Sequence, residues 1–349
     1  MLRWALANGY SMDETTCAKA ARQGRLEVLR WARKKGCPWS TKTCRAAAAG
    51  GQLEVLKWLQ RKGCPWDAVA CAEAAGRGNL ELLKWLRGQG CPWDDWTCQW
   101  AARNGRLEVL RWVVPNGCPG VGLICDEAAL NGHLEVLQWA QKTGLDLGED
   151  ACTFASIKGH MEVLQWLWAQ GCPWDSYICA FAAGRGNLDL LKWVRERGCP
   201  WDHRTCSFAA SKGYWEVLKW AREQGCPWDE STCACAAARG DLAMLKWLRD
   251  QGCRWSQTTC SYAIQHGHQE VLKWAQEHGC PSKKMEDFLQ FLRTTNNPTN
   301  TTTIGHRRSL ATTESSLSSS SSSSAATPLP SSAGLHPARN ASSVRKRFD

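Results

Sequence analysis

The chain has 349 residues, with 43 Lys and Arg against 33 Asp and Glu, which gives a formal net charge of +10. Its length alone would allow two or three globular domains. No apolar run approaches the ~20 residues that a membrane-spanning helix needs, so we expect no membrane span. The 20 cysteines and 22 tryptophans are unusual numbers, and both follow a period.

A 27-residue unit recurs without insertion or deletion from near the first residue to about residue 280. Its second glycine marks each copy: Gly36, Gly63, Gly90, Gly117, Gly144, Gly171, Gly198, Gly225, Gly252 and Gly279. A fixed period of this length is the signature of stacked repeats, which grow by units rather than by domains. We therefore predict an all-α solenoid of about ten units over residues 1–293 and a disordered Ser/Thr-rich tail over residues 294–349.

Residues 1–9 match only the second half of the unit. Terminal repeats normally carry a polar cap, and half a unit would expose an apolar edge. We therefore expect a truncated N-terminus. Because no signal peptide precedes the repeats, we expect an intracellular protein, cytoplasmic rather than nuclear, whose cysteines are structural thiols.

The first complete unit, residues 13–39, begins with a predicted short helix. Asp13 is placed to accept hydrogen bonds from the free amides of the first turn, and Asp or Ser recurs at this position in later units. Cys17, Ala20 and Ala21 fall on one narrow face, so that another helix can approach closely. Gly24 follows, where a left-handed residue ends a helix.

The second predicted helix of the unit is more apolar than the first. Leu26, Leu29 and Trp31 belong to a face too wide for the small first helix to cover. We expect the next unit to bury the apolar surface that remains, which stabilises the stack by about 25 cal/mol per Å². Gly36 and Pro38 then end the helix, and we expect Trp39 to pack over the turn between units.

This two-helix unit resembles an ankyrin repeat over about residues 1–280. Ala20-Ala21, Gly24, Glu27-Val28-Leu29 and Gly36 match the family pattern without gaps. The link between units is six residues shorter than in the 33-residue family unit, so we expect short turns in place of the β-hairpin finger and little or no strand. The resemblance implies a binding scaffold that acts as a monomer on one or more other proteins.

Two junctions depart from the pattern. Pro115 to Gly122 interrupts the end of one second helix, and residues 145–148 replace the next Cys-Pro-Trp-Asp. A bend in the stack and neutral drift are both open interpretations. Beyond Cys280, Phe288 to Leu292 could form a capping helix, and the low-complexity tail that follows cannot bury enough apolar surface to order itself.

Catalysis and metal binding find little support in the sequence. Zinc sites want closely paired ligands, and Cys233 and Cys235 are the only close pair of cysteines. The histidines mostly follow the first glycine of a unit, where we expect them to satisfy backbone groups. No cysteine is singled out by a base, as nucleophilic catalysis requires. We predict no enzyme activity, no metal and no cofactor.

The basic excess makes nucleic acid the alternative partner. Lys57, Lys84 and their counterparts, except Lys246, however, follow an acidic residue by three positions, which predicts ion pairs on a solvated helix face.

Two positions of the first helix vary between otherwise similar units, which suggests freedom from packing constraints. Aromatic residues predominate in the C-terminal half of one of these positions, where Phe154, Phe181 and Phe208 would form a ladder if they face outward. The opposite interpretation, core packing, stays open. The predicted partner-binding residues are Trp96, Trp100, Phe154, Tyr177, Phe181, Arg204, Phe208 and Tyr262.

Overall fold

The computed structural model describes residues 13–282, which belong to one compact unit. This part of the chain contains twenty α-helices, one short 3-10 helix and no strand. The predicted all-α repeat fold without a β-hairpin finger is therefore confirmed for these residues. The half repeat at 1–9, the capping helix at 288–292 and the tail lie outside the described residues.

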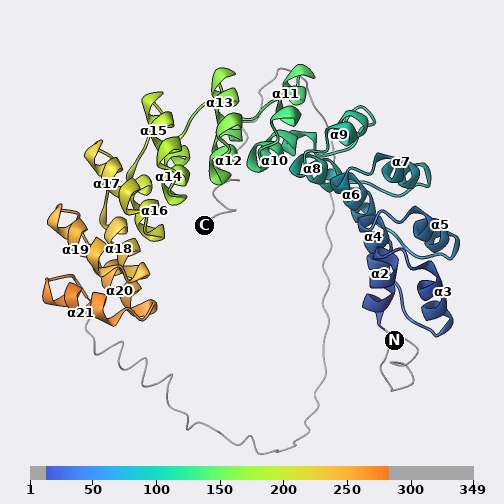
Figure 1. Cartoon of the computed structure of the whole chain (residues 1–349), viewed down its shortest axis with the longest axis horizontal. Helices are drawn as coiled ribbons and strands as arrows, with labels where there is room; N and C mark the ends of the chain where they lie inside the picture. Colours follow the sequence, from blue (N-terminus) through green and yellow to red (C-terminus); the bar gives the residue numbers. More distant parts are fainter. Residues whose placement is uncertain (1–12, 283–349) are drawn as a thin grey trace, which may run out of the picture. The chain divides into compact units, whose positions relative to one another are not determined.

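Each repeat contributes two helices. The first helices are α2 Glu14–Arg22, α4 Thr41–Ala49, α6 Ala68–Arg77, α8 Asp95–Arg103, α10 Ile124–Asn131, α12 Ala151–Lys158, α14 Ser176–Gly184, α16 His203–Lys212, α18 Glu230–Arg239 and α20 Gln257–Gln265. The second helices are α3 Leu26–Lys34, α5 Leu53–Arg61, α7 Leu80–Gly88, α9 Leu107–Val113, α11 Leu134–Lys142, α13 Met161–Ala169, α15 Leu188–Glu196, α17 Trp215–Glu223, α19 Leu242–Asp250 and α21 Gln269–Glu277. Within this unit the first helices follow the inner side of a curved row and the second helices follow its outer side (Figure 1).

Local hydrogen bonds explain why the helices begin and end where they do. The Asp13 carboxylate accepts from the Thr16 amide, and Ser40, Asp175, Asp202 and Asp229 cap their helices in the same way. Asp67, Asp94 and Ser256 stand at the same position but make no side-chain cap bond. Gly36 closes the second helix at φ 82°.

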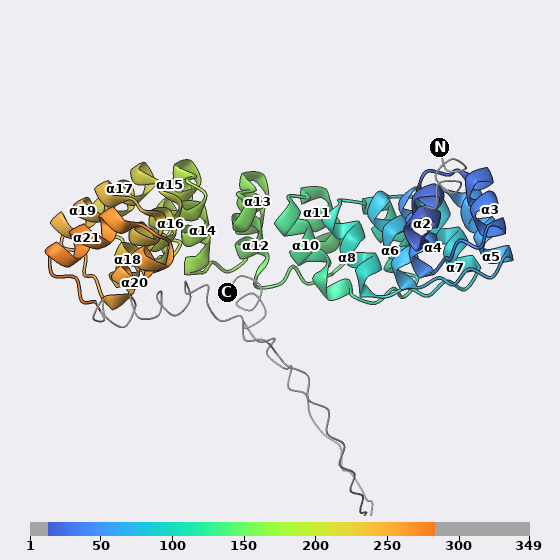
Figure 2. The ribbon, with the colours of Figure 1, turned by 90° about the horizontal axis from the view of Figure 1, so that it is seen from below.

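Contacts between repeats are made mainly by the first helices, which lie side by side along the row. Figure 2 shows the same order from below. Cys44, Ala47 and Ala48 of α4 are fully buried, and their counterparts in the other first helices are buried as well, except Ile264 of α20, which is half-buried. Side chains this small let the helix backbones approach closely, so each first helix packs against the first helices before and after it.

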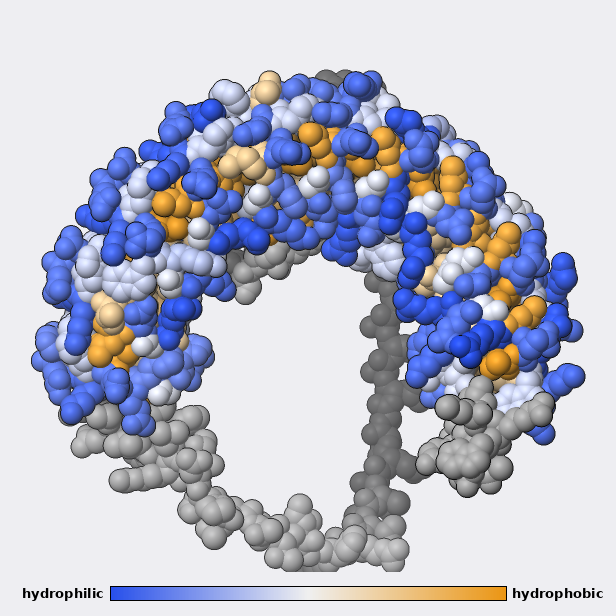
Figure 3. Space-filling view, viewed as in Figure 1, coloured by the Kyte–Doolittle hydropathy of each residue, from blue (hydrophilic) through white to orange (hydrophobic). Residues whose placement is uncertain are grey.

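The second helices attach to this row through their leucines and valines. Leu56 and Leu59 of α5 are fully buried, whereas Trp58 is only half-buried. The expectation that the helix tryptophan is buried in the stack is therefore met only in part. The buried face consists of the aliphatic residues, and the tryptophans lie at its margin. Figure 3 shows hydrophobic residues in a band along the row, bordered by hydrophilic ones.

The tryptophans link neighbouring second helices at the turns, as expected for Trp39. The Trp39 ring meets the Trp58 ring of the next repeat edge to face, with centroids 5.7 Å apart. Arg33 stacks 3.9 Å over Trp39 and donates to the Cys37 carbonyl at 2.7 Å. Six further pairs join a turn tryptophan to the next helix tryptophan, all edge to face except the tilted Trp174–Trp193: Trp66–Trp85, Trp93–Trp112, Trp174–Trp193, Trp201–Trp220, Trp228–Trp247 and Trp255–Trp274. Such aromatic pairs contribute about 0.5–1.5 kcal/mol beyond the area that they bury.

The irregular junction between α9 and α10 continues the stack with altered elements. Helix α9 ends at Val113, two residues before Pro115, and the 3-10 helix η1 Val121–Leu123 precedes α10. Gly120 adopts φ 83° and lies against Asp95, whose Cβ would be 2.4 Å from a Cβ placed at Gly120. A bend at this junction stays a hypothesis.

Substitution of Ala74 by Leu tests the close approach of the first helices. Ala74 on α6 is fully buried, so the larger side chain should force the helices apart and lower the free energy of unfolding by about 1–3 kcal/mol. Ala243→Leu on α19, an exposed position, is the matched control and should change it by less than about 0.5 kcal/mol. Urea denaturation followed by circular dichroism measures both, and equal effects would contradict the packing described.

Candidate partner-binding surface

Helix α8 presents a pair of tryptophans. Trp96 is 47% exposed and Trp100 is half-buried, and their rings meet edge to face with centroids 6.4 Å apart. Gly76 at the end of α6 lies beneath Trp100: a Cβ at this position would come within 3.2 Å of the Trp100 Cβ. The small residue in one repeat therefore makes room for the large ring in the next.

Helices α14 and α16 present a second aromatic group. Tyr177 and Phe181 stack with ring centroids 5.9 Å apart, and Phe208 lies 6.0 Å from Phe181. Gly184 underlies Phe208 as Gly76 underlies Trp100, because a Cβ there would come within 3.3 Å of the Phe208 Cβ. All three rings are half-buried.

Arg204 is held in a fixed position beside this group. Its guanidinium lies 3.8 Å over the Tyr177 ring and donates to Asp202 at 2.6 Å and to Ser176 at 3.0 Å. The hydrogen bond to Asp202 raises the pKa of Arg204. Burial raises the pKa of Asp202, the bonds from Arg204 and Ser176 lower it, and the net shift is downward. The ion pair is therefore charged at neutral pH.

The structure separates the predicted residues by exposure. Phe154 is only 4% exposed, on α12 between α10 and α14, so it cannot take part in an exposed ladder. Tyr262 on α20 is 42% exposed. We therefore define the first-helix surface by the seven remaining residues: Trp96, Trp100, Tyr177, Phe181, Arg204, Phe208 and Tyr262.

A basic recess adjoins Trp100. It has a volume of about 480 Å³ and is lined by Glu73, Gly76, Arg77, Trp100, Arg103, Asn104 and Arg106. Arg103 forms an ion pair with the buried Glu127 at 3.3 Å, and Arg106 donates to the Gly76 carbonyl at 3.2 Å. Burial raises the pKa of Glu73, although Arg77, Arg22 and Arg45 oppose the shift.

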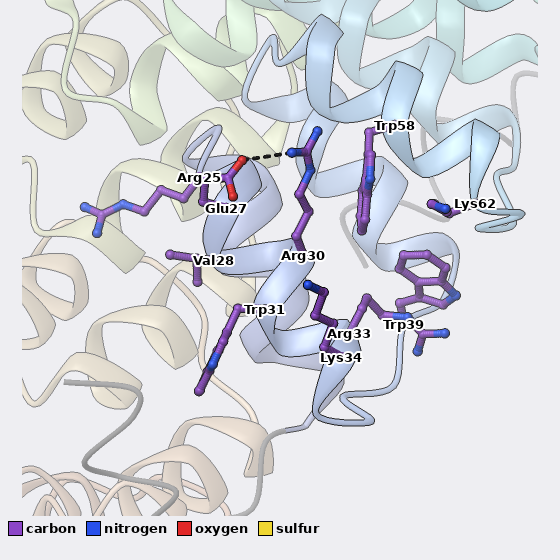
Figure 4. Close-up of a pocket in the computed structure, with 10 residues that line it drawn as sticks. All are labelled: Arg25, Glu27, Val28, Arg30, Trp31, Arg33, Lys34, Trp39, Trp58 and Lys62. Atoms are coloured by element: carbon purple, nitrogen blue, oxygen red, sulfur yellow. Dashed lines mark hydrogen bonds and ion pairs between the residues drawn. The ribbon is translucent and has the colours of Figure 1, made fainter.

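A larger groove of about 1120 Å³ lies along α3 and α5. Figure 4 shows Trp39 and Trp58 at one side of it and Trp31 at the other. Its cationic residues are Arg25, Arg30, Arg33, Lys34 and Lys62. Arg30 pairs with Glu27 at 3.0 Å and Arg33 stacks on Trp39, while Arg25, Lys34 and Lys62 form no ion pair with any described residue.

The predicted ion pairs on the second helices form in part. Lys57 lies 2.7 Å from Glu54, Lys84 3.4 Å from Glu81 and Lys219 3.7 Å from Glu216. Lys192 lies 6.0 Å from the centre of the Trp220 ring instead. Three lysines at this position are thus paired within their own helices, as the spacing predicts.

Histidines and cysteines occupy structural positions. The Nε2 atoms of His133, His160 and His268 lie 2.9–3.1 Å from backbone carbonyls of the preceding repeat, which confirms the expected role. The cysteines are free thiols, and all but Cys172 and Cys235 are buried. Residues 13–282 contain no group of three or more His, Cys, Asp or Glu placed to hold a metal ion.

Two exposed aromatic residues escaped the sequence analysis. Trp168 on α13 is 44% exposed, and Tyr214 is 38% exposed. Trp168 occupies the position at which Arg33 and its counterparts stack on the turn tryptophan, and its own ring lies 6.2 Å from Trp174. The sequence signal that could have identified Trp168 is its departure from the residue type that other repeats carry at this position. Trp168 lies on an outer helix, whereas Tyr214 lies in the turn between α16 and α17, and neither belongs to the first-helix surface.

Comparison with known proteins agrees with the repeat architecture. A family model described as ankyrin repeats (many copies) matches residues 125–167, which span α10 to α13. Together with the helix pair that recurs along the described residues, this match identifies the chain as an ankyrin-like repeat protein. No curated protein matches the sequence.

Solved structures similar in fold include pentatricopeptide repeat proteins. One is PPR10 in complex with an 18-nt psaJ RNA element, with a TM-score of 0.41, 15% identity, and coverage of 76% of this chain and 48% of that one. Another is PPR10 from maize, with a TM-score of 0.37, 15% identity, and coverage of 77% and 49%. The chain spans about half the length of these structures.

None of the helices in residues 13–282 has the length and apolar character that crossing a membrane requires.

Substitution of Glu73 by Gln tests the electrostatics of the basic recess. A carboxyl whose pKa is raised in the folded state destabilises that state when it is charged, so the penalty is present above the folded pKa and disappears below the unfolded pKa of about 4.3. Glu73→Gln should therefore raise the urea midpoint at pH 7 and leave it unchanged near pH 3. Glu162→Gln, exposed in the first turn of α13, should raise it at neither pH. A lower midpoint for Glu73→Gln at pH 7 would contradict the raised pKa.

Proposed function

We propose that this ankyrin-like repeat protein is a non-catalytic scaffold that binds another protein through the first-helix surface. The observation that carries the proposal is the set of large aromatic side chains that project from rigid helices and remain accessible. Trp96 and Tyr262 are both more than 40% exposed. Trp, Tyr and Arg are the residues most enriched among binding hot spots, because they combine a large contact area with a polar group.

The environment of these residues supports binding rather than chance exposure. Trp100 and Phe208 rest on glycines of the preceding repeat, and Arg204 is fixed by Asp202, Ser176 and the Tyr177 ring. Side chains that are already ordered lose little conformational entropy when a partner binds, which favours affinity. The basic recess beside Trp100 suits a partner that carries a carboxylate near its apolar contact residue.

Nucleic acid is the second candidate partner, and the groove along α3 and α5 is the observation that favours it. Single-stranded nucleic acid binds where aromatic rings stack on bases and cationic side chains follow the backbone. The groove offers three tryptophans and three cationic side chains outside ion pairs. We favour a protein partner because Arg33 and Arg30 are engaged within the protein.

Affinity capture with the full chain tests the proposed surface. The double variant Trp96→Ala/Tyr262→Ala should bind a captured protein about tenfold more weakly or worse, because each substitution removes a potential hot-spot side chain. The matched variant Trp168→Ala/Tyr214→Ala removes the same residue types from positions outside the first-helix surface and should bind as the wild type does. The partner is identified by mass spectrometry, and surface plasmon resonance then measures its dissociation constant for each variant.

The same capture separates the two partner classes. Protein binding through the first-helix surface should persist between 50 and 200 mM salt, whereas binding through 6–10 phosphate contacts should weaken by about 10³–10⁵. Capture that disappears with salt or nuclease treatment, and that the first double variant leaves unchanged, would replace the proposed function by nucleic-acid binding.

A further inference from the structure

Nine repeats each place two thiols side by side in the core. The Sγ atoms of Cys17 and Cys37 lie 3.0 Å apart. Thiol–thiol contacts with the same 20-residue separation join Cys44–Cys64, Cys71–Cys91, Cys98–Cys118, Cys152–Cys172, Cys179–Cys199, Cys206–Cys226, Cys233–Cys253 and Cys260–Cys280. Only Cys125 and Cys235, of all twenty cysteines, stand outside these pairs.

The fold of each repeat fixes the position of both thiols. Cys17 lies on the first helix, and Cys37 follows the glycine that ends the second helix. The Cys37 amide donates to the Ala32 carbonyl at 3.0 Å, which closes the helix end. The Cys37 thiol also lies 3.1 Å from the carbonyl of Asp13, the cap of the first helix. The pair therefore joins the start of the repeat to its end.

Disulfide formation fits this geometry better than metal binding does. Two thiolates that bind one zinc ion in tetrahedral geometry, each with its sulfur about 2.3 Å from the metal, have sulfur atoms farther apart than those of Cys17 and Cys37. The described residues also contain no cluster of three or more metal-binding side chains. A disulfide requires the two sulfur atoms to approach to about 2.05 Å, a movement of about one ångström from the separation observed.

We propose that the nine cysteine pairs are sites of reversible oxidation by a low-molecular-weight disulfide, each forming one disulfide within its own repeat. A thiolate of the pair attacks the small disulfide, and one small thiol leaves as a mixed disulfide forms. The second protein thiolate then attacks the protein sulfur of this mixed disulfide and releases the second small thiol. The protein loses two electrons and two protons, and the reagent gains both.

Burial controls how the pairs react. Burial and the contact with Cys37 raise the pKa of Cys17 to about 12, so little of the reactive thiolate is present at neutral pH. The buried pairs therefore react when the chain refolds or when a repeat opens. Cys172 is the only paired cysteine that is not buried, and its pair with Cys152 should be oxidised first in the folded protein.

The repeat formed by α10 and α11 has only one of the two cysteines, which provides an internal control. Leu145 stands where the partner of Cys125 would be, and its amide donates to the Ala140 carbonyl at 2.9 Å, as the Cys37 amide does to Ala32. The backbone there keeps the register of the other repeats, and Cys125 itself is buried. The Leu145→Cys variant should therefore gain a tenth disulfide with Cys125.

Refolding of the full chain in oxidised glutathione, followed by alkylation, digestion and mass spectrometry, tests the proposal. We expect nine cross-linked peptides, each joining cysteines 20 residues apart, with Cys125 and Cys235 alkylated. In the folded protein, the Cys152–Cys172 link should form first. Links between different repeats, or full alkylation of all twenty cysteines after refolding, would overturn the proposal.

Variants give a second measurement that does not depend on mapping. The oxidised wild type should unfold at a higher temperature than the reduced form, because each bridge restricts a loop of the unfolded chain. Leu145→Cys should increase this difference and remove the alkylation of Cys125. Leu147→Cys, two residues farther along, should leave Cys125 alkylated. A Leu145→Cys variant whose Cys125 stays free after refolding would show that the repeat geometry does not form these bridges.

Discussion

The structure depends on the close approach of neighbouring first helices. Alanine and cysteine side chains recur in this contact, and they are buried in repeat after repeat. Because these side chains are small, the helix backbones pack tightly and the second helices lie outside them in a separate row. The same constraint explains the strict 27-residue period: an added residue in either helix would turn the small face away from its neighbour.

Second helices attach to this row, and tryptophans connect them to one another. Leucine and valine fix each second helix to its own first helix, while the turn tryptophan of one repeat packs on the helix tryptophan of the next. Arginines stack on the turn tryptophans and also donate to the carbonyl of the following cysteine. The basic residues at these turns thus stabilise the stack, which reduces the part of the net charge that is available to a polyanion.

The first-helix surface exists because adjacent repeats complement each other across a spacing of 24 residues. Gly76 makes room for Trp100, Gly184 makes room for Phe208, and Arg103 pairs with Glu127. Where one repeat carries a large side chain at this surface, the repeat before it carries a residue that makes room for it. The large side chains therefore do not disturb the helix contacts beneath them. The thiol pairs lie in the same repeats, and their oxidation would stiffen the helix pairs that carry the surface.

The sequence by itself determined the repeat unit, the helix pairs, most of their caps and the place of the turn tryptophans, because these features depend on residues a few positions apart. Only the tertiary structure decided which aromatic residues are exposed. Phe154 and Phe208 occupy equivalent positions, yet one is buried and the other rests half-exposed on a glycine, since exposure depends on side chains from the neighbouring repeats. The cysteine pairs likewise depend on the angle between two helices and the turn that follows them, which a spacing of 20 residues does not specify.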